Sequence, residues 1–114
     1  MTENIIPFSD WEKLDLRVGQ IKKVEEIEGA DKLYKLEIDL GKEIGKRTVC
    51  AGLKAHYPKD KLKGKKVIVF VNLAPRKLKG IESQGMVLAA VNKDESKVIL
   101  LSPEDDIEVG SKVR

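Results

Sequence analysis

The residues with the clearest chemical potential in this sequence are the cations between Lys54 and Gly80. Nine Lys or Arg residues fall in this stretch against one acid, Asp60, which gives it a formal charge of +8. The remainder of the chain sums to −5, so the net charge of +3 conceals a strongly basic region. Clustered cations on a small domain indicate a polyanionic partner. These cations flank an apolar run, Val67 to Val71, which a solvated tail would lack.

The stretch from residue 72 to residue 86, NLAPRKLKGIESQGM, is the most distinctive part of the basic region. Three cations stand within four of its positions: Arg76, Lys77 and Lys79. Such side chains can neutralise phosphates, while Asn72, Ser83 and backbone N–H groups can add directional hydrogen bonds. A solvated basic loop that only closes a barrel has the same composition. Charge and spacing alone therefore leave these two interpretations equal.

Four further cations could widen the same surface, namely Lys32, Lys35, Arg47 and Lys54. Solubility is the simpler explanation for each of these residues taken singly.

Aromatic residues are scarce in the sequence: Phe8, Trp11, Tyr34, Tyr57 and Phe70. Single-strand binders usually present several exposed rings, whereas Tyr34 and Phe70 are core residues by pattern. Tyr57 is the best candidate for an exposed ring, although packing within a loop is the simpler role. A basic surface poor in rings is better suited to folded RNA recognised by shape and backbone.

Other chemistry finds little support in the sequence. One histidine, His56, and one cysteine, Cys50, cannot form a zinc site of the usual spacing, and no GxxxxGK[ST] phosphate loop is present. A hydrolase that uses Ser83 and His56 is a remote alternative. We therefore expect no catalytic residues, no metal and no cofactor, and hence no enzyme activity of the chain itself.

The bulk composition predicts one domain over residues 1–114, with a loosely ordered N-terminus over residues 1–7. No apolar run approaches the roughly 18 residues that span a bilayer, so no membrane partner is expected. The N-terminus does not resemble a secretory signal. Since Cys50 has no partner for an internal disulfide, a reducing cytoplasm is the expected location.

The hydrophobic pattern predicts short strands and very little helix. Ser9 and Glu12 form a capping-box pattern that would open a helix ending near Leu14, with Ser9 as the N-cap. Gly19 interrupts an alternating apolar pattern, which suggests a bulge or bend in one long first strand. Gly52 and Gly85 are expected to mark tight backbone positions.

Further strands are predicted at 34–40, 48–53, 67–71, 86–91 and 98–101, with a short final segment at 107–113. Residues 54–62 can hold a short helix or turn, and residues 72–82 are expected to form a loop. This order indicates an all-β protein. The long bent first strand favours an OB-fold, a five-stranded barrel, with a short N-terminal helix and extra C-terminal strands.

Four ordered blocks of the sequence resemble the tRNA-binding-domain family: 15–21 (DLRVGQI), 30–34 (ADKLY), 72–78 (NLAPRKL) and 83–86 (SQGM). The resemblance covers roughly residues 8–114. The family includes the C-terminal domain of many methionyl-tRNA synthetases and small freestanding tRNA-binding proteins. The resemblance implies an OB-fold that binds tRNA with little sequence preference and assists a synthetase without catalysis.

Carried over onto this chain, the family's binding motif falls on Lys32, Asn72, Arg76, Lys77, Lys79, Ser83 and Met86. Periodicity alone would instead make Met86 a core residue. The resemblance further implies methionyl-tRNA synthetase as a possible partner.

Homodimerisation is expected from the resemblance and from the sequence itself. The apolar N-terminal flap (Ile5, Ile6, Phe8 and Trp11) and the strand at 98–101 offer more hydrophobic surface than one small barrel needs to cover.

The alternative function is a peptide-binding or chaperone-like protein-interaction module. A related branch of small proteins is described as an export chaperone, and its members lack the Ser-x-Gly-Met return that this chain has at 83–86.

Overall fold

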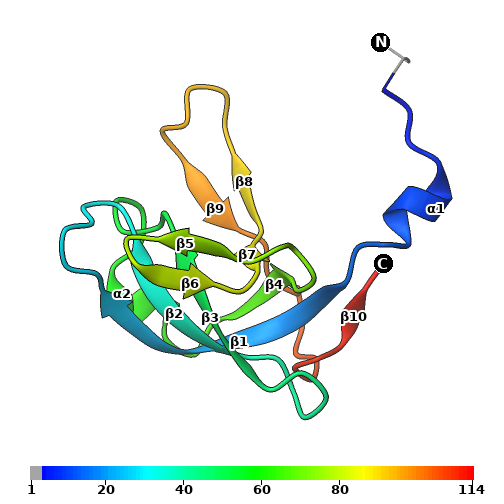
Figure 1. Cartoon of the computed structure of the whole chain (residues 1–114), viewed down its shortest axis with the longest axis horizontal. Helices are drawn as coiled ribbons and strands as arrows, with labels where there is room; N and C mark the ends of the chain where they lie inside the picture. Colours follow the sequence, from blue (N-terminus) through cyan, green and yellow to red (C-terminus); the bar gives the residue numbers. More distant parts are fainter. Residues whose placement is uncertain (1–3) are drawn as a thin grey trace.

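The computed structural model describes residues 4–114 and consists mainly of short strands (Figure 1). The helices are α1 (Phe8–Trp11) and α2 (Lys59–Leu62). The strands are β1 (Leu16–Glu26), β2 (Tyr34–Asp39), β3 (Lys46–Ala51), β4 (Lys66–Phe70), β5 (Arg76–Leu78), β6 (Ile81–Ser83), β7 (Met86–Val87), β8 (Ala89–Val91), β9 (Val98–Leu100) and β10 (Lys112–Val113). No helix among these residues is long and apolar enough to cross a membrane.

The main sheet is antiparallel and runs in the order β3-β2-β1-β4-β7, with β10 also paired to β1. Strand β1 is long enough to pair with β4 along its first half, from Leu16 to Gln20, and with β2 from Gln20 onward. Because β1 pairs with two different strands along its length, the sheet curls into the expected five-stranded OB-type barrel. Two hairpins, β5–β6 and β8–β9, are added to the barrel.

The core lies inside the barrel and follows the period-two pattern of the strands. In β2, Tyr34, Leu36 and Ile38 are buried while the residues between them are half-buried. In β4, Val67, Ile68 and Val69 are all buried, because this strand is covered on both faces. The prediction of a central fourth strand is thereby confirmed.

The bend in β1 has a different origin from the predicted one. Its register against β2 shifts between Ile21 and Lys23, so the bulge lies after Gly19 rather than at it. A Cβ at Gly19 would lie 2.6 Å from Ile38 Cγ2 and 2.9 Å from Leu40 Cδ2. Gly19 is therefore required by close packing across the barrel interior, not by the bulge.

Side chains help to close the barrel between β3 and β6, because β6 is too short to form a full ladder of backbone hydrogen bonds with β3. The Cys50 backbone nitrogen donates to Ser83 Oγ at 3.0 Å, and the Gln84 nitrogen donates to the Thr48 carbonyl at 2.8 Å. The Thr48 nitrogen in turn donates to Gln84 Oε1 at 3.2 Å. These three bonds join the end of β6 to β3 and satisfy backbone groups that the sheet leaves open.

Three local predictions need correction. Helix α1 begins two residues earlier than expected: Pro7 is its N-cap, and no side chain caps it, so Ser9 lies inside the helix. Residues 72–82 are not a simple loop, because β5 and β6 form a hairpin there. The expected strand at 86–91 is divided into β7, which pairs with β4, and β8, which pairs with β9.

The two glycines predicted to mark tight positions differ. Gly85 has a φ of +120°, and a Cβ there would lie 2.8 Å from the Phe70 carbonyl oxygen, so it does mark one. Gly52 has open space around it, and that prediction is wrong.

The prediction of a loosely ordered segment over residues 1–7 falls partly on residues 1–3, outside the described residues, and stays a prediction.

Replacement of Ser83 by alanine should lower the free energy of unfolding by about 1–3 kcal/mol, because the Cys50 N–H would lose its acceptor in a buried position. Urea denaturation followed by circular dichroism measures this change. The matched control is Ser102→Ala at an exposed serine, which should shift stability by no more than about 0.5 kcal/mol. Equal stabilities of the two variants would contradict the closure that we describe.

Candidate functional site

The cations of the predicted motif are presented by the β5–β6 hairpin. Its two-residue turn is formed by Lys79 and Gly80, which have φ values of +52° and +80°. Positive φ at both central positions is the signature of a type I′ turn, whose twist matches that of paired strands. Gly80 supplies this conformation without strain, and Lys79 is placed at the tip of the hairpin.

An apolar cluster fixes the hairpin against the turn between β1 and β2. Ile27, Ala30 and Cys50 are buried there, and Leu33, Leu78 and Ile81 pack against them. Leu78 and Ile81 face each other across the two hairpin strands, so each strand contributes one contact. The cluster therefore holds the hairpin tip beside residues 29–33.

As a result, Lys32 and Lys79 line one hollow although they are 47 residues apart in sequence. Asp31 lines the same hollow but forms no ion pair with either lysine. Arg76 and Met86 line an adjoining groove, and Leu33 is shared by the two. The structure thus brings four of the seven predicted residues onto one face.

Lys77 lies on the other face of the hairpin. Side chains alternate along a strand, so Arg76 and Leu78 share a face while Lys77 points the opposite way. Its cross-strand neighbour in the register is Glu82. Lys77 is exposed but does not line the groove that holds Arg76.

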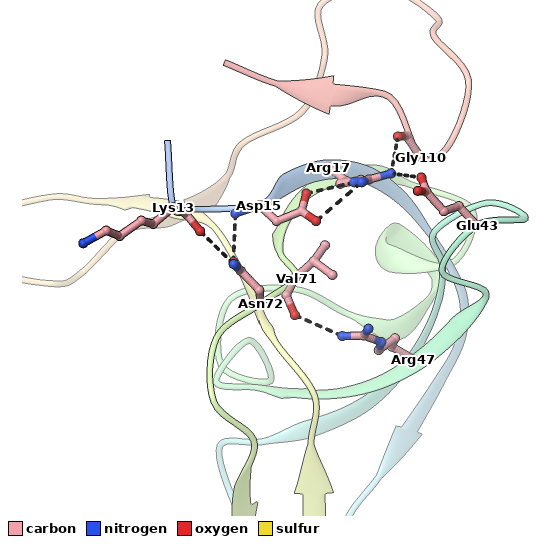
Figure 2. Close-up of polar contacts among 8 residues, drawn as sticks. All are labelled: Lys13, Asp15, Arg17, Glu43, Arg47, Val71, Asn72 and Gly110. Atoms are coloured by element: carbon pink, nitrogen blue, oxygen red, sulfur yellow. Dashed lines mark hydrogen bonds and ion pairs between the residues drawn. The ribbon is translucent and has the colours of Figure 1, made fainter. Parts of the chain in front are cut away.

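The polar groups of Ser83 and Asn72 are already engaged within the protein. Ser83 is 3% exposed and also donates to the Gly85 carbonyl. Figure 2 shows Asn72 at the start of β1, where its Oδ1 accepts from the Asp15 nitrogen at 2.8 Å and its Nδ2 donates to the Lys13 carbonyl at 2.7 Å. Both residues hold backbone segments in place, and neither has a free group aimed at the groove.

The predicted site cations differ from two of the cations expected to extend the surface in that they form no ion pair among the described residues. Within residues 4–114, Lys32, Arg76, Lys77 and Lys79 form no ion pair. Lys35 instead pairs with Glu25 at 3.7 Å, and Lys54 pairs with Glu26 at 2.6 Å.

The Lys54–Glu26 hydrogen bond raises the pKa of Lys54 and lowers the pKa of Glu26. Arg47 donates to the Val71 carbonyl at 3.0 Å, as Figure 2 also shows. These bonds hold parts of the fold together and occupy three of the four cations that could have widened the surface. Lys32 is the exception.

Two residues near the site have structural roles. Tyr57 accepts from the Leu100 nitrogen through its hydroxyl, and its carbonyl accepts from the Tyr34 hydroxyl, so the packing role is confirmed over exposed stacking. Burial raises the pKa of the Cys50 thiol, which keeps it neutral and unreactive. In the part of the chain that the structure describes, no group of three or more His, Cys, Asp or Glu residues is placed to hold a metal ion.

Met86 is 38% exposed, so the core position that periodicity favoured is wrong, while the binding role implied by the resemblance stays a prediction. Sequence reasoning missed Leu33 and Gly52, which line the groove, and Gln84, which closes the barrel. Gln84 carried a weak signal, since it stands in the Ser-Gln-Gly return. Leu33 and Gly52 carried none, because their role depends on which elements meet in space.

Comparison with known proteins assigns the chain to a family. Residues 16–112 match the model of a family described as a putative tRNA binding domain. The chain belongs to this tRNA-binding-domain family.

The chain is similar to methionine–tRNA ligases over nearly its whole length. It is 50% identical over 109 residues to that of Pyrococcus horikoshii, and 51% identical over 110 residues to that of Methanococcus maripaludis. Each match covers 96% of this chain. The chain spans only 14% and 16% of the length of these relatives.

Two solved structures are similar along their full length. A protein described as related to methionyl-tRNA synthetase, from Pyrococcus horikoshii, superimposes with a TM-score of 0.90 at 37% identity, covering 97% of this chain and 99% of that one. A CsaA chaperone protein from Picrophilus torridus gives 0.87 at 38% identity, covering 96% and 100%. The OB-type fold is therefore shared with both.

The geometry of the hairpin turn predicts how its two residues respond to substitution. Lys79→Asn should leave the free energy of unfolding unchanged or raise it slightly, since asparagine favours the left-handed conformation of a type I′ turn. Gly80→Ala should lower it by about 1 kcal/mol or more, because alanine is strained at positive φ. Urea denaturation of both variants measures this; a stability loss in Lys79→Asn equal to that in Gly80→Ala would contradict the assigned turn.

Proposed function

We propose that this chain is a non-catalytic tRNA-binding module that recognises the shape and backbone of folded tRNA. The observation that carries the proposal is the set of exposed cations on the β5–β6 hairpin and the neighbouring turn, which have no acidic partner among the described residues. Membership of the tRNA-binding-domain family supports it.

The mechanism is electrostatic docking on phosphates held at a fixed spacing. Lys32 and Lys79 come from different elements but share one hollow, so a phosphate placed there contacts both. Arg76 extends the contact along the groove, and Lys77 on the outer face meets a neighbouring stretch of backbone. Asn72 and Ser83 contribute by fixing the segments on either side of the hairpin. Such contacts carry little sequence information, which fits recognition by shape.

We further propose that the module serves a methionine–tRNA ligase in the cytoplasm. The similarity to ligases of that name supports this, although the chain spans only a small part of them. By holding tRNA close to a catalytic partner, the module raises the effective concentration of substrate without taking part in the reaction. Capture of the chain from source lysate should recover the ligase together with tRNA, and recovery of neither would count against this role.

A homodimer is the proposed state of the chain, because an apolar surface stays exposed beside the buried cluster on the outer face of β1 and β4. Leu16, Val18 and Ile68 are buried there under Phe70, Leu88 and Val113. Leu101, which bonds to the Leu88 and Ile68 backbones, is 43% exposed at the edge of this surface, and Ile99 is 56% exposed. Phe8, Trp11 and Leu14 on the N-terminal flap are also exposed. A second copy would cover this surface.

A second candidate function is the binding of unfolded peptide, which two observations favour. The groove beside Arg76 is largely apolar, and solved structures described as CsaA chaperones share the fold. A denatured client that still binds after the hairpin cations are neutralised, and in the presence of excess tRNA, would establish it. The unpaired cations at the groove have no role in that function, so we rank tRNA binding first.

The affinity for tRNA should fall steeply with salt. If about five phosphates are engaged, log K should decrease with log salt with a slope of about −3.5 to −4.5. The Lys32→Ala/Lys79→Asn double variant should reduce the magnitude of that slope by about 0.7–0.9, the amount for one phosphate contact, because the two lysines share one phosphate. Filter binding or fluorescence anisotropy across a salt series measures both quantities.

The matched control removes the same charge from the other end of β2, in the Lys42→Ala/Lys46→Ala variant. Its slope should equal that of the unaltered chain. An affinity that does not change with salt, or equal effects of the two double variants, would rule out the proposed site.

The proposed dimer predicts that Ile99→Glu gives a monomer in sedimentation at micromolar concentration, because a charge would be buried in an apolar interface. Val91→Glu is the control: Val91 is 52% exposed but lies on the opposite face of the β8–β9 hairpin. It should remain dimeric. A monomer before any substitution would reject the proposal.

A further inference from the structure

An apolar groove lies beside the cations of the hairpin, and no segment of residues 4–114 occupies it. It has a volume of about 250 Å³ and is bordered by the end of β3, the β5–β6 hairpin and the β8–β9 hairpin. Leu33, Leu78, Met86 and Val98 contribute apolar side chains. Among its lining residues, all within the described chain, Arg76 carries the one charge, since the Cys50 thiol is kept neutral by burial.

The groove is open where Gly52 forms part of its wall. No heavy atom lies within 4 Å of the position that a Cβ would take at Gly52, and its backbone does not have a positive φ. The chain therefore tolerates a side chain there on both steric and conformational grounds. The groove also adjoins the hollow that holds Lys32 and Lys79, because Leu33 lines both.

We propose that this groove accepts a single unstacked nucleobase of the bound RNA. The inference rests on the proposed tRNA-binding function and adds a base contact to its phosphate contacts. A base that leaves the stack needs an apolar slot for its two faces, and proteins supply it with apolar side chains as well as aromatic ones. Leu33 and Met86 provide such faces, and the planar guanidinium of Arg76 can stack on the base.

Charge complementarity selects a nucleotide over an apolar peptide as the occupant. A base in the groove places its own phosphate toward the adjoining hollow, where Lys32 and Lys79 are exposed and unpaired among the described residues. An apolar peptide would fill the groove but leave these two cations without a partner. The groove suits the flat base of a nucleotide, and the two cations suit its phosphate.

Among residues 4–114 the groove has no aromatic residue in its lining, and its other side chains explain how it can still hold a base. The two tyrosines, Tyr34 and Tyr57, are instead engaged in packing and in hydrogen bonds with each other and with Leu100. Aliphatic, thioether and guanidinium groups take the place of an aromatic platform. Stacking on aliphatic and thioether groups and on the face of a guanidinium does not read the edge of the base, so the groove is expected to accept any base that the tRNA fold leaves unstacked.

The test adds bulk at the wall of the groove and removes no cation. Gly52→Val should weaken binding of a full-length tRNA transcript about tenfold to a hundredfold, the loss expected for one stacked base. The slope of log K against log salt should stay the same, because no cation has been removed. Arg76→Lys should also weaken binding with an unchanged slope, since lysine keeps the charge but loses the planar face.

The matched control is Ala55→Val, which adds bulk at an exposed position three residues away and outside the groove. It should bind tRNA with the affinity of the unaltered chain. Urea denaturation of all three variants shows whether each is folded before its affinity is compared.

Three outcomes separate this inference from the function on which it rests. If Gly52→Val binds as tightly as Ala55→Val, the groove holds no base, and tRNA binding through phosphates still stands. If Gly52→Val abolishes binding of a denatured protein client but leaves tRNA affinity intact, the groove is a peptide site and the inference is overturned. If the unaltered chain shows no salt-dependent affinity for tRNA, the proposed function itself fails.

Discussion

The attachment of the β5–β6 hairpin to the rest of the barrel is the constraint on which the functional surface depends. Two kinds of contact make this attachment. Ser83 and Gln84 satisfy backbone groups of β3, while Leu78 and Ile81 pack on the cluster around Ala30. The first kind fixes the end of the hairpin and the second fixes its tip. Without either, Lys79 and Arg76 would lie on a mobile loop, at a conformational-entropy cost for every contact with a ligand.

The same attachment explains why a Ser-Gln-Gly return follows the hairpin. Serine offers an acceptor to a buried N–H, glutamine pairs with Thr48 through both backbone and side chain, and Gly85 allows close approach to the Phe70 carbonyl. Each of the three residues makes a different contact that helps to close the barrel. In the proposed site Ser83 would therefore act by holding the hairpin in place rather than by contact with RNA, as would Asn72, which joins the start of β1 to the end of β4.

Sequence reasoning recovered the fold because alternation in Tyr34–Asp39 and the apolar run at Val67–Phe70 report local burial directly. It missed the hairpin at 76–83 because each strand has only three residues, too few for a period to show. It also could not tell free cations from paired ones: Lys54 and Lys79 look alike until Glu26 is seen beside the former. For the same reason the groove was invisible, since Leu33, Gly52 and Met86 come from three separate elements.

Mapping the tRNA contact on the protein by nuclear magnetic resonance shows directly whether the β5–β6 hairpin and the turn beside it bind tRNA. Isotope-labelled chain would be titrated with tRNA, and backbone amide and methionine methyl signals followed. The account predicts that the largest changes fall on residues 29–33, Gly52, 76–80 and Met86, while residues 41–46 at the other end of β2 stay unperturbed. Changes concentrated on residues 41–46 or spread evenly over the barrel, with the hairpin signals unmoved, would contradict it.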